Sequence, residues 1–445
     1  MSNTKYGLAL LGCGTVGSGV YDLLTRQGAD IEAKYGFQFD VRKILVRDSK
    51  KLRSIKPQLL TTDFNEIIND SKIDVVVEVM GGEMPAKEYV TAALRSGRHV
   101  ITANKALMGA FGERLVEKAR SHNLFFGFSA AVTGFHQFVP SIVKSMMITE
   151  LTGIFNGTTN YILCKLAHKS FDEALRDAQA LGYAEADHTN DTEGHDTRNK
   201  LVVASKLAFG VFLPSKDIPV IGIKDITQED IAHAADLGYV IKLLGVSRVV
   251  EDRLTSYVAP SLLPQNDPLA TVHDVNNGIL IRDQLANGVQ GMIAAGAGKG
   301  ATAKAIFSDL LGLARGEKTL WPEASSYGRN LKFTAKNNLA ALFYVRVNVD
   351  NQPGVLATVS KRFAREGLNI IEVSQKAHVG SSTASIVFLM GPARQKVIEK
   401  ILDGLVEAKI AVSKPLMLRV EHSPEMETES TPISTKTNRD KLVPA

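Results

Sequence analysis

Apolar residues fall into short runs that alternate with helix-like patterns over the first 130 positions. The runs lie at residues 6–11, 41–46, 74–80 and 98–105. After the first run, Val20, Leu23 and Leu24 recur at the spacing of one helix face. Continuous apolar runs of this length are typical of parallel strands that are buried on both faces. The pattern predicts an α/β protein, with a Rossmann-type doubly wound parallel sheet over residues 1–130 that a segment at about 300–335 completes.

The pattern changes twice further along the chain. Residues 131–300 lose the regular alternation and predict a separate α+β domain. Residues 340–420 predict a ferredoxin-like strand-helix-strand-strand-helix-strand module, because strand-like alternation at 342–349 is followed by a helical pattern and two more strands. Residues 421–445 are polar and rich in Pro, Ser and Thr, so we expect a disordered tail.

Composition excludes several classes of protein. The chain has 445 residues, of which 44% are hydrophobic and 22% charged, which is typical of a globular protein. No apolar run approaches the about 20 residues of a membrane-spanning helix, so we expect a cytoplasmic protein with no membrane partner. The net charge is only +5 and no basic stretch is interleaved with aromatics, which argues against binding to nucleic acid. Cys13 and Cys164 lack the spacing of a zinc or redox pair and indicate a reducing compartment.

A G-x-G-x-x-G motif, Gly12-Cys13-Gly14-Thr15-Val16-Gly17, separates the first strand from its helix. Such glycines allow a tight turn, a close approach to a pyrophosphate and close packing of the helix on the strand. The helix N-terminus adds backbone amides that bind phosphate. We therefore expect a dinucleotide to bind at Gly12, Gly14, Thr15, Val16 and Gly17, and a purely structural turn is the alternative.

The end of the second strand favours NADP over NAD. An NAD enzyme places an acidic residue there for the ribose 2′-hydroxyl, but this chain has Arg47, with Lys50, Lys51 and Arg53 after it. A guanidinium at this point suits a 2′-phosphate. Asp48 leaves NAD open as a second cofactor, and a solvated basic loop is the alternative.

Lys105 ends the fourth strand. Ligands of doubly wound sheets bind at the carboxyl ends of the strands, so we expect Lys105 to face the cofactor cleft. The alternative, a lysine that only faces solvent, fits less well because the preceding Thr102, Ala103 and Asn104 are compact for an exposed loop.

Two polar segments of the middle domain carry candidate chemistry. Residues 151–161 predict a strand and a polar turn before a helix, where amides and hydroxyls can bind a carboxylate. Helix capping alone would also explain Thr158 and Asn160. Residues 182–200 hold five acidic residues, and Asp196 and Lys200 share one face if a helix begins near Asp196. An ordinary helix ion pair accounts for that spacing, whereas the acidic loop beside Lys105 indicates a receptacle for a cationic group together with a proton donor.

The histidines of this segment do not predict a metal site. His188 and His195 lack the helical spacing of metal ligands, and an EF-hand loop that starts at Asp187 has Thr192 where a glycine is required. We expect no dedicated metal site.

The chain resembles bacterial homoserine dehydrogenase of the type that carries a C-terminal ACT domain, over residues 5–420. The shared motifs are Gly12–Gly17, Val79–Gly82, Thr102–Lys105, Asn156–Leu163, Gly182–Lys200 and Gly296–Gly298 before Thr302. The resemblance implies an NAD(P)-dependent oxidoreductase that interconverts L-homoserine and L-aspartate 4-semialdehyde, on the route to threonine, methionine and isoleucine. It also implies a homodimer or homotetramer that assembles through the catalytic domain at 131–300.

The resemblance implies roles for single residues as well. Lys105, Lys200 and Asp196 are the implied catalytic residues, and the two lysines would protonate the aldehyde oxygen as hydride arrives. The implied substrate-binding residues are Glu185, Asp191, Asp196, Gly157 and Thr158. Gly298 would close over the nicotinamide. The implied effector residues of the ACT domain are Asp350, Gly354 and Asn369, with L-threonine as the effector, and a purely structural oligomerisation module is the alternative.

The chain departs from the family pattern in two places. Ser129 stands where the family has a carboxylate that supports a monovalent cation site, so only a weak cation site is expected at Val132 and Gly134. Phe135 replaces a glycine near the expected nicotinamide position, and His136-Gln137 replaces Ile-Pro. In the acidic segment, His188 replaces a proline and Thr192 an aliphatic residue. These departures leave a second hypothesis open, that of a divergent paralogue with a related amino-acid substrate or of an inactive nucleotide- and amino-acid-binding sensor.

Overall fold

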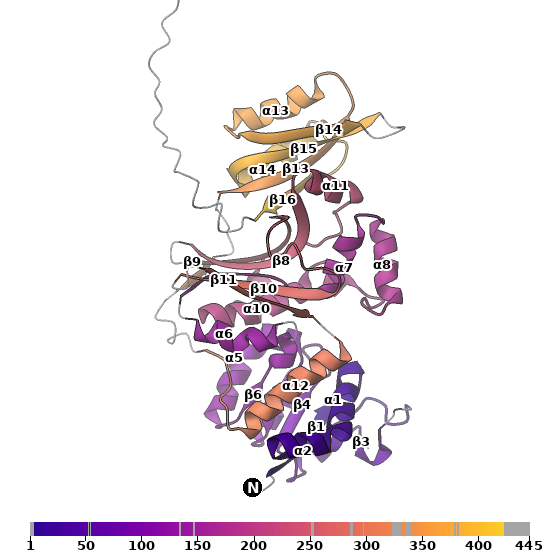
Figure 1. Cartoon of the computed structure of the whole chain (residues 1–445), viewed down its shortest axis with the longest axis vertical. Coiled ribbons are helices and arrows are strands. Elements are labelled where there is room, and N and C mark those ends of the chain that lie inside the picture. Colours follow the sequence, from indigo (N-terminus) through magenta and orange to yellow (C-terminus); the bar gives the residue numbers. More distant parts are fainter. Residues whose placement is uncertain are drawn as a thin grey trace, which may run out of the picture. The chain divides into compact units, whose positions relative to one another are not determined.

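The structure is a computed structural model of the whole chain (Figure 1). It describes residues 4–51, 53, 55–132, 135–145, 147–250, 253–284, 288–296, 298–322, 331–334, 340–377, 380 and 382–421. The chain forms two compact units. The first unit comprises residues 1–232, 242–260 and 272–338, and the second comprises residues 233–241, 261–271 and 339–445. The boundaries expected for three separate domains stay predictions, and the expected tail beyond Glu421 lies outside the described residues.

A six-stranded parallel sheet opens the first unit. Its strands are β1 (Thr4–Leu11), β2 (Phe37–Leu45), β3 (Leu60–Thr61), β4 (Val75–Glu78), β5 (His99–Thr102) and β6 (Phe126–Gly127). The strand order β3-β2-β1-β4-β5-β6 reverses direction beside β1, as in dinucleotide-binding sheets. The helices that accompany it are α1 (Thr15–Arg26), α2 (Gly28–Tyr35), α3 (Asn65–Ile68), α4 (Ala86–Arg95) and α5 (Lys105–Ser121). The predicted Rossmann-type sheet is therefore confirmed.

Helix α12 (Lys299–Ala314) joins this sheet from a distant part of the sequence. It packs beside α1, and the two helices share one apolar core with strands β1, β2, β4 and β5 (Figure 1). Its small and apolar residues, among them Ala303, Ile306 and Leu310, are buried in that core. The N-terminus of α12 thereby lies among the residues that border the sheet's carboxyl edge.

A mixed sheet and its helices lie mainly in the first unit, although residues 233–236, 239–241 and 261–264 of these elements belong to the second unit. The strands of this sheet are β7 (Ile148–Ile154), β8 (Tyr239–Val250), β9 (Arg253–Pro264), β10 (Asn276–Asp283), β11 (Gly288–Ala295) and β12 (Lys332–Thr334). They follow the order β11-β10-β7-β8-β9, with β12 parallel to β9. The α-helices between residues 139 and 236 are α6 (Val139–Lys144), α7 (Gly157–Lys165), α8 (Phe171–Ala180), α9 (Thr189–Thr192), α10 (His195–Phe209) and α11 (Gln228–Asp236). Short 3₁₀ turns lie at Pro57–Leu59, Ser129–Val132, His136–Phe138 and Ser215–Asp217.

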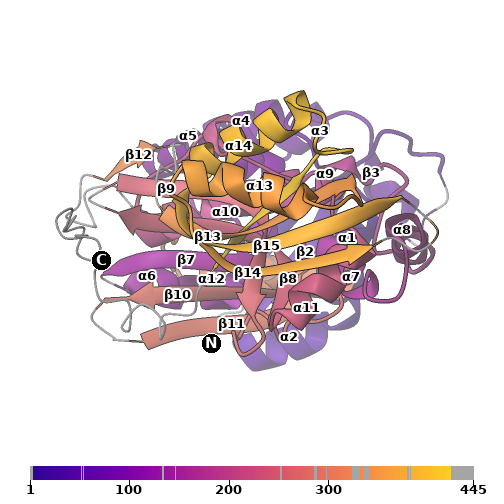
Figure 2. The same ribbon diagram turned by 90° about the horizontal axis from the view of Figure 1, so that it is seen from above.

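The second unit contains the predicted ferredoxin-like module. Its elements are β13 (Ala340–Asp350), α13 (Val355–Arg365), β14 (Ile370–Ala377), β15 (Thr383–Arg394), α14 (Gln395–Glu407) and β16 (Leu416–Val420). The strand order is β16-β13-β15-β14, and all of these pairs are antiparallel. Helices α13 and α14 lie side by side over the sheet, where Phe363 packs edge-on against Phe388 (Figure 2). This arrangement confirms the predicted order of elements.

Helices α5 and α10 pack closely against each other in the first unit. A side chain at Gly109 of α5 would meet the amide oxygen of Asn199 of α10 at 3.3 Å, so glycine allows the close approach. Further along the two helices, buried Lys206 donates to Glu113 (2.9 Å), which also accepts from the indole of Trp321 (2.8 Å). This ion pair connects the helix that begins at Lys105 with the helix that carries Asp196 and Lys200.

We expect the two halves of this ion pair to differ in their contribution to stability. Glu113→Ala leaves the buried Lys206 ammonium without its carboxylate and should cost about 3 kcal/mol, whereas Lys206→Met leaves a partly exposed carboxylate that water solvates and should cost about 1 kcal/mol. Urea denaturation followed by the fluorescence of Trp321, the only tryptophan of the sequence, measures both values. Equal costs for the two variants would contradict the proposed asymmetry.

Candidate active site

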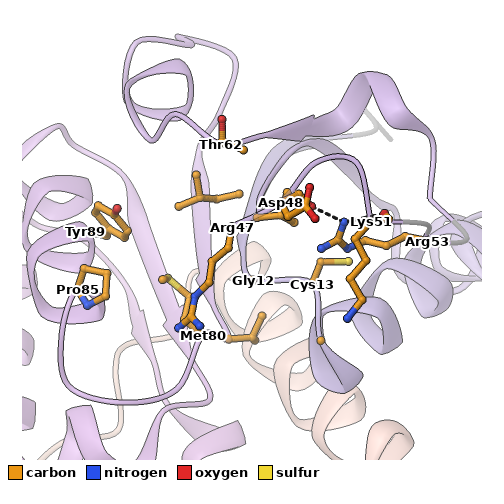
Figure 3. Close-up of a pocket in the computed structure, with 14 residues that line it drawn as sticks. Gly12, Cys13, Arg47, Asp48, Lys51, Arg53, Thr62, Met80, Pro85 and Tyr89 are labelled. Atoms are coloured by element: carbon orange, nitrogen blue, oxygen red, sulfur yellow. Dashed lines mark hydrogen bonds between the residues drawn. The ribbon is translucent and has the colours of Figure 1, made fainter.

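Two cavities lie along the carboxyl edge of the parallel sheet, and Val79 and Met80 border both. The first, of about 600 Å³, extends from the glycine-rich turn to Arg47 and Lys51 after β2 and to Tyr89 of α4. Figure 3 shows the Arg47 side chain extending toward Met80, with Lys51 and Arg53 nearer to Cys13. The position fits the nucleotide end of a dinucleotide.

The three glycines of the turn have different neighbours. Gly12 has a φ of +110°, and a Cβ there would lie 2.9 Å from the carbonyl oxygen of Val79. A Cβ on Gly17 would lie 2.3 Å from the carbonyl oxygen of Gly12, so helix α1 packs on the strand only because this residue is glycine. A Cβ on Gly14 meets no described atom within 4 Å. Gly12 and Gly17 are thus required by the fold, and Gly14 faces open space beside the first cavity.

The basic residues after β2 are organised by backbone contacts. The Arg53 guanidinium donates to the carbonyl oxygens of Asp48 (2.7 Å) and Lys51 (2.9 Å), so it holds the loop together (Figure 3). One carboxylate oxygen of Asp48 accepts from the backbone N–H of Lys50 (2.8 Å). Arg47 and Lys51 are exposed, border the cavity and have no carboxylate partner among the described residues. These two cations are available to an anionic ligand.

The second cavity, also of about 600 Å³, brings together residues from six parts of the first unit. It is bordered by Thr15 and Val16 of α1, the segments 79–82 and 103–106 after β4 and β5, Glu185, Asn190, Asp196 and Asn199 of the acidic segment, Ala130, and Gly296, Gly298 and Thr302 at α12. Gly298 precedes α12 with a φ of +122°, which favours glycine. All the motifs singled out in the sequence except Asn156–Leu163 therefore have residues around one cavity.

Lys105 is held at this cavity by the ends of β4 and β5. Buried Glu78 accepts from the hydroxyl of Thr102 (2.6 Å) and from the backbone N–H of Met80 (2.8 Å). Asn104 caps helix α5 by accepting from the N–H of Leu107 (3.0 Å), and its amide donates to Gly82 (2.5 Å). Helix α5 consequently starts at Lys105, which borders the cavity as its position at the strand end predicts.

Asp196 lies between two lysines. Its carboxylate is 2.8 Å from the Nζ of Lys105 and 3.2 Å from the Nζ of Lys200, which is one helical turn further along α10. Helix α10 begins at His195, so the i,i+4 contact inferred from the spacing is present. Lys105 keeps about a third of its side chain exposed, whereas Lys200 is only 2% exposed and does not border either cavity. Lys105 thus faces the cavity and Lys200 lies behind Asp196.

The three groups titrate differently because of their neighbours. Burial opposes the charge of Asp196, but Lys105 and Lys200 outweigh it and hold the pKa of Asp196 well below its usual range. Burial also opposes the charge of Lys105, yet the surrounding carboxylates, Asp196 first, raise the pKa of Lys105. For Lys200, burial prevails over the attraction of Asp196, and with the repulsion of Lys105 it lowers the pKa of Lys200 to about 8. Lys200 therefore loses its proton before Lys105 does.

Asn156 joins the acidic groups, and it is the residue that reasoning from the sequence missed. Its amide donates to Asp191 (2.7 Å) and to Asp196 (2.9 Å), and its amide oxygen caps helix α7 by accepting from the N–H of Thr159 (2.8 Å). The alternative that Thr158 and Asn160 cap this helix is wrong, because the cap is Asn156, two residues before Thr158. An Asn-Gly pair directly before a helical pattern is the signal that identifies such a cap.

Only part of the acidic segment reaches the site. Glu185 borders the cavity, and Asp191 touches the site through Asn156; burial and the charge of Asp196 raise the pKa of Asp191. Asp187 accepts from the backbone of Thr189 and is exposed, and Glu193 pairs with Lys224 at 2.5 Å. The five acidic residues thus divide into three at or beside the site and two with structural contacts elsewhere.

Gly157 and Thr158 have structural contacts that are visible without a substrate. A Cβ at Gly157 would lie 2.3 Å from the carbonyl oxygen of Val275, and the hydroxyl of Thr158 donates to the carbonyl of Tyr183 (2.6 Å). Together they fix the N-terminus of helix α7 against the acidic segment. Their expected role in substrate binding stays a prediction.

Ser129, which stands where the family has a carboxylate, has a partner on α12. Ser129 donates its hydroxyl (2.6 Å) and its backbone N–H (2.9 Å) to buried Asp309 of α12, and burial raises the pKa of Asp309 to about 7. Ser129 therefore supplies no carboxylate for a monovalent cation. Val132 is buried and Gly134 lies outside the described residues, so the weak cation site expected there stays a prediction.

Phe135 does not border either cavity. It is 1% exposed and packs edge-on against Phe155, with ring centroids 5.5 Å apart. His188 lies one helical turn from Thr192, whose hydroxyl donates to the carbonyl of His188 (3.2 Å). Because a hydroxyl has one proton to donate, the contact between the Thr192 hydroxyl and the His188 ring (3.1 Å) has Nδ1–H of the ring as its donor. None of these contacts obstructs the cavity that Lys105 faces.

The expected effector residues lie in two turns of the second unit. Asp350 ends β13 and Gly354 caps α13 with a φ of +86°, as a glycine-containing turn requires. Asn369 is exposed directly before β14, and its carbonyl accepts from Gly391 (2.8 Å). Binding of an effector at these residues stays a prediction.

The part of the chain that the structure describes contains no helix that is long and apolar enough to cross a membrane. It also contains no group of three or more His, Cys, Asp and Glu side chains placed to hold a metal ion. Cys13 and Cys164 are not paired in a disulfide.

A parallel sheet of this strand order, a glycine-rich turn and a cavity with paired lysines and a carboxylate define the class of NAD(P)-dependent oxidoreductases. Family models agree with this class. The model described as homoserine dehydrogenase matches residues 137–311, that of its NAD-binding domain matches residues 12–127, and that of the ACT domain matches residues 343–406. The chain belongs to the homoserine dehydrogenase family.

Relatives match nearly the whole chain. Homoserine dehydrogenase of Bacillus subtilis is 32% identical over 93% of this chain and 98% of its own length, and that of Corynebacterium glutamicum is 35% identical over 93% and 95%. The crystal structure of a homoserine dehydrogenase from Thiobacillus denitrificans has a TM-score of 0.86 and 31% identity, and covers 94% of this chain and 99% of its own. The Staphylococcus aureus structure at pH 7.5 has a TM-score of 0.73 and 30% identity over the same shares.

We expect two glycine variants to separate binding from folding. Gly14→Ala adds a methyl group in open space, so the chain should fold with an unchanged melting temperature but bind nucleotide at least about tenfold more weakly, because the backbone no longer approaches the pyrophosphate closely. Gly17→Ala should instead lower the melting temperature. Calorimetric titration and thermal unfolding distinguish the two, and unchanged nucleotide binding by Gly14→Ala would contradict the assignment.

Proposed function

We propose that this protein interconverts L-homoserine and L-aspartate 4-semialdehyde by hydride transfer to or from a nicotinamide nucleotide, a step toward threonine, methionine and isoleucine. The observation that carries the proposal is the Lys105–Asp196–Lys200 array beside a cavity that the glycine-rich turn and Gly298 also border. Membership of the homoserine dehydrogenase family supports the substrate assignment. The hypothesis of an inactive sensor has no supporting contact, because Phe135 does not border the cavity.

The substrate is a zwitterion, and we assign its ammonium to carboxylates at the second cavity and its carboxylate to backbone amides of α7, which do not border that cavity. Glu185 borders the cavity and Asp191 lies beside it, so these carboxylates bind the ammonium group. The backbone amides of Gly157 and Thr158, at the N-terminus of the nine-residue helix α7, bind the carboxylate. Between these two ends, the hydroxyl carbon is directed toward Lys105.

The lysines act on the oxygen of the reacting carbon. The bound nicotinamide supplies or accepts the hydride. Reduction of the aldehyde builds negative charge on its oxygen. The Lys105 ammonium, which is charged before the reaction because its pKa is raised, stabilises that charge and donates a proton to it. In the oxidation direction Lys105 takes the hydroxyl proton while one of its own protons passes through Asp196 to Lys200, the lysine that is neutral above about pH 8.

The cofactor that the basic edge fits best is NADP. Arg47 and Lys51 border the first cavity without carboxylate partners among the described residues, and a 2′-phosphate would give both a counter-charge. Asp48 is already engaged with the N–H of Lys50, which weakens its suitability for a ribose hydroxyl. NAD is thus the second cofactor of this site.

Regulation and assembly follow from the second unit and from family membership. Asp350, Gly354 and Asn369 bind L-threonine as a feedback effector, and the functional form is a homodimer or homotetramer in the cytoplasm. The family model of the ACT domain supports a regulatory role for residues 343–406.

Replacement of the lysines tests the proposed reaction. Oxidation of L-homoserine by the wild type should rise with pH through about 8, because the neutral form of Lys200 accepts the proton, and reduction should fall over the same range. Lys105→Met and Lys200→Met should each lower kcat at least about 100-fold, and Lys200→Met should also abolish the pH dependence. Initial rates with NADP and NAD measure this. Lys118→Met, on the same helix α5, is the control, and no turnover by the wild type with either cofactor would refute the function.

Replacement of Arg47 tests the cofactor assignment. Arg47→Ala should raise KM for NADP about tenfold, the equivalent of one charge-assisted hydrogen bond, while KM for NAD changes less than about threefold. Lys56→Ala removes an exposed cation that does not border the cavity and serves as the control. Equal effects on both cofactors would contradict a contact between Arg47 and the 2′-phosphate.

A further inference from the structure

Lys200 shares its second hydrogen-bond acceptor with a residue that none of the motifs includes. The Nζ of Lys200 donates to the carbonyl oxygen of Phe155, and the side-chain amide of Asn277 donates to the same oxygen (2.9 Å). Asn277 lies on β10, 122 positions from Phe155, and is 2% exposed. A backbone carbonyl has two lone pairs, so these two donors occupy both of them.

The shared carbonyl is fixed by packing. The ring of Phe155 occupies space that glycines leave open, because a Cβ on Gly153 or Gly245 would lie 2.7 Å or 2.9 Å from its ring atoms. Phe135 packs edge-on against the same ring. The carbonyl therefore does not shift to suit Lys200. The hydrogen bond from Asn277 then determines how strongly the carbonyl oxygen accepts from the lysine.

The orientation of the Asn277 carboxamide is equally constrained. Its amide oxygen is buried and has no hydrogen-bond partner among the described residues. That oxygen lies against Gly296, where a Cβ would be only 2.1 Å away. A flipped carboxamide would direct its oxygen at the Phe155 carbonyl, an unfavourable contact. Asn277 thus keeps its amide on Phe155 although its own oxygen remains unsatisfied, which indicates a functional constraint.

We propose that Asn277 is a positioning residue that sets the geometry and proton affinity of Lys200 through the Phe155 carbonyl they share. The inference rests on the role proposed above for Lys200. By donating to the carbonyl, Asn277 reduces the negative charge that the oxygen offers to an ammonium, and so favours the neutral amine. The other charged groups that face Lys200 are Asp196 on its own helix, Lys105 on α5 and, beyond Asp196, Asp191, and none of them contacts Asn277 in the described structure.

The test compares Asn277→Ala and the nearly isosteric Asn277→Asp in the full-length enzyme. Both should lower kcat for L-homoserine oxidation about tenfold and leave KM within about threefold, because the substrate contacts are intact. Both should also move the rising limb of the kcat profile to higher pH, by about half a unit for Ala and further for Asp, whose negative charge stabilises the ammonium. Asn276→Asp places the same charge one residue earlier on β10 and should leave the limb in place, since among the described residues the Asn276 side-chain amide donates to the carbonyl of His273 and not to Phe155.

Melting temperature and NADP binding, measured on each variant, separate positioning from folding. Variants that bind NADP, lose stability and keep the wild-type pH limb would overturn the inference, because a purely structural role moves stability alone. Lys200→Met, assayed in parallel, distinguishes the two levels of proposal. If Lys200→Met keeps activity and the limb, the proposed function of Lys200 fails; if it loses both while the Asn277 variants behave as the wild type, only the inference about Asn277 fails.

Discussion

The ion pairs of a buried carboxylate, Asp196, with two lysines are the constraint on which the rest of the site depends. A carboxylate that is 4% exposed is costly to bury unless it is paired and hydrogen-bonded. Lys105 and Lys200 supply the charge, and the amide of Asn156 supplies a further hydrogen bond. Lys105 starts helix α5 of the nucleotide-binding part, whereas Asp196 and Lys200 belong to α10. The need to pair the buried carboxylate therefore holds Lys105 of α5 against Asp196 of α10.

The two lysines of the array also differ in burial, and this gives them different pKa values. Two ammonium groups beside one carboxylate carry one net positive charge. In surroundings of low dielectric constant, this charge is more stable on one lysine than on the other. Lys105, nearer to solvent and to Glu185, retains its proton, whereas buried Lys200 gives its proton up near neutral pH. Two lysines with separated pKa values can therefore take different roles. Lys105 stays charged and acts on the substrate oxygen, and Lys200 takes up or releases the net proton.

The sequence predicts the parts of this structure that rest on local patterns. Apolar runs and the glycine-rich turn predict the parallel sheet, and the spacing of Asp196 and Lys200 predicts their contact. Asn156 and Asn277 are not predictable in the same way, because their partners are 35 to 122 positions away and one of them is a backbone carbonyl, which no residue type identifies. Thr158 and Asn160 have side chains that can cap a helix, but both lie inside helix α7. The residue directly before the helix is Asn156, so Asn156 is the cap.

The departures from the family pattern are accommodated behind the cavity instead of within it. The hydroxyl of Ser129 is taken up by Asp309, His188 pairs with Thr192, and Phe135 fills space beside the Phe155 ring. Each of these three residues thus contacts a partner that does not border the cavity. Two of the partners belong to segments that position cavity groups, because the Phe155 carbonyl accepts from Lys200 and helix α12, which carries Asp309, follows Gly298. A close-packed interior transmits such changes as small shifts of position. The altered residues consequently bear on how the lysines are held, while the groups that border the cavity keep the family's chemistry.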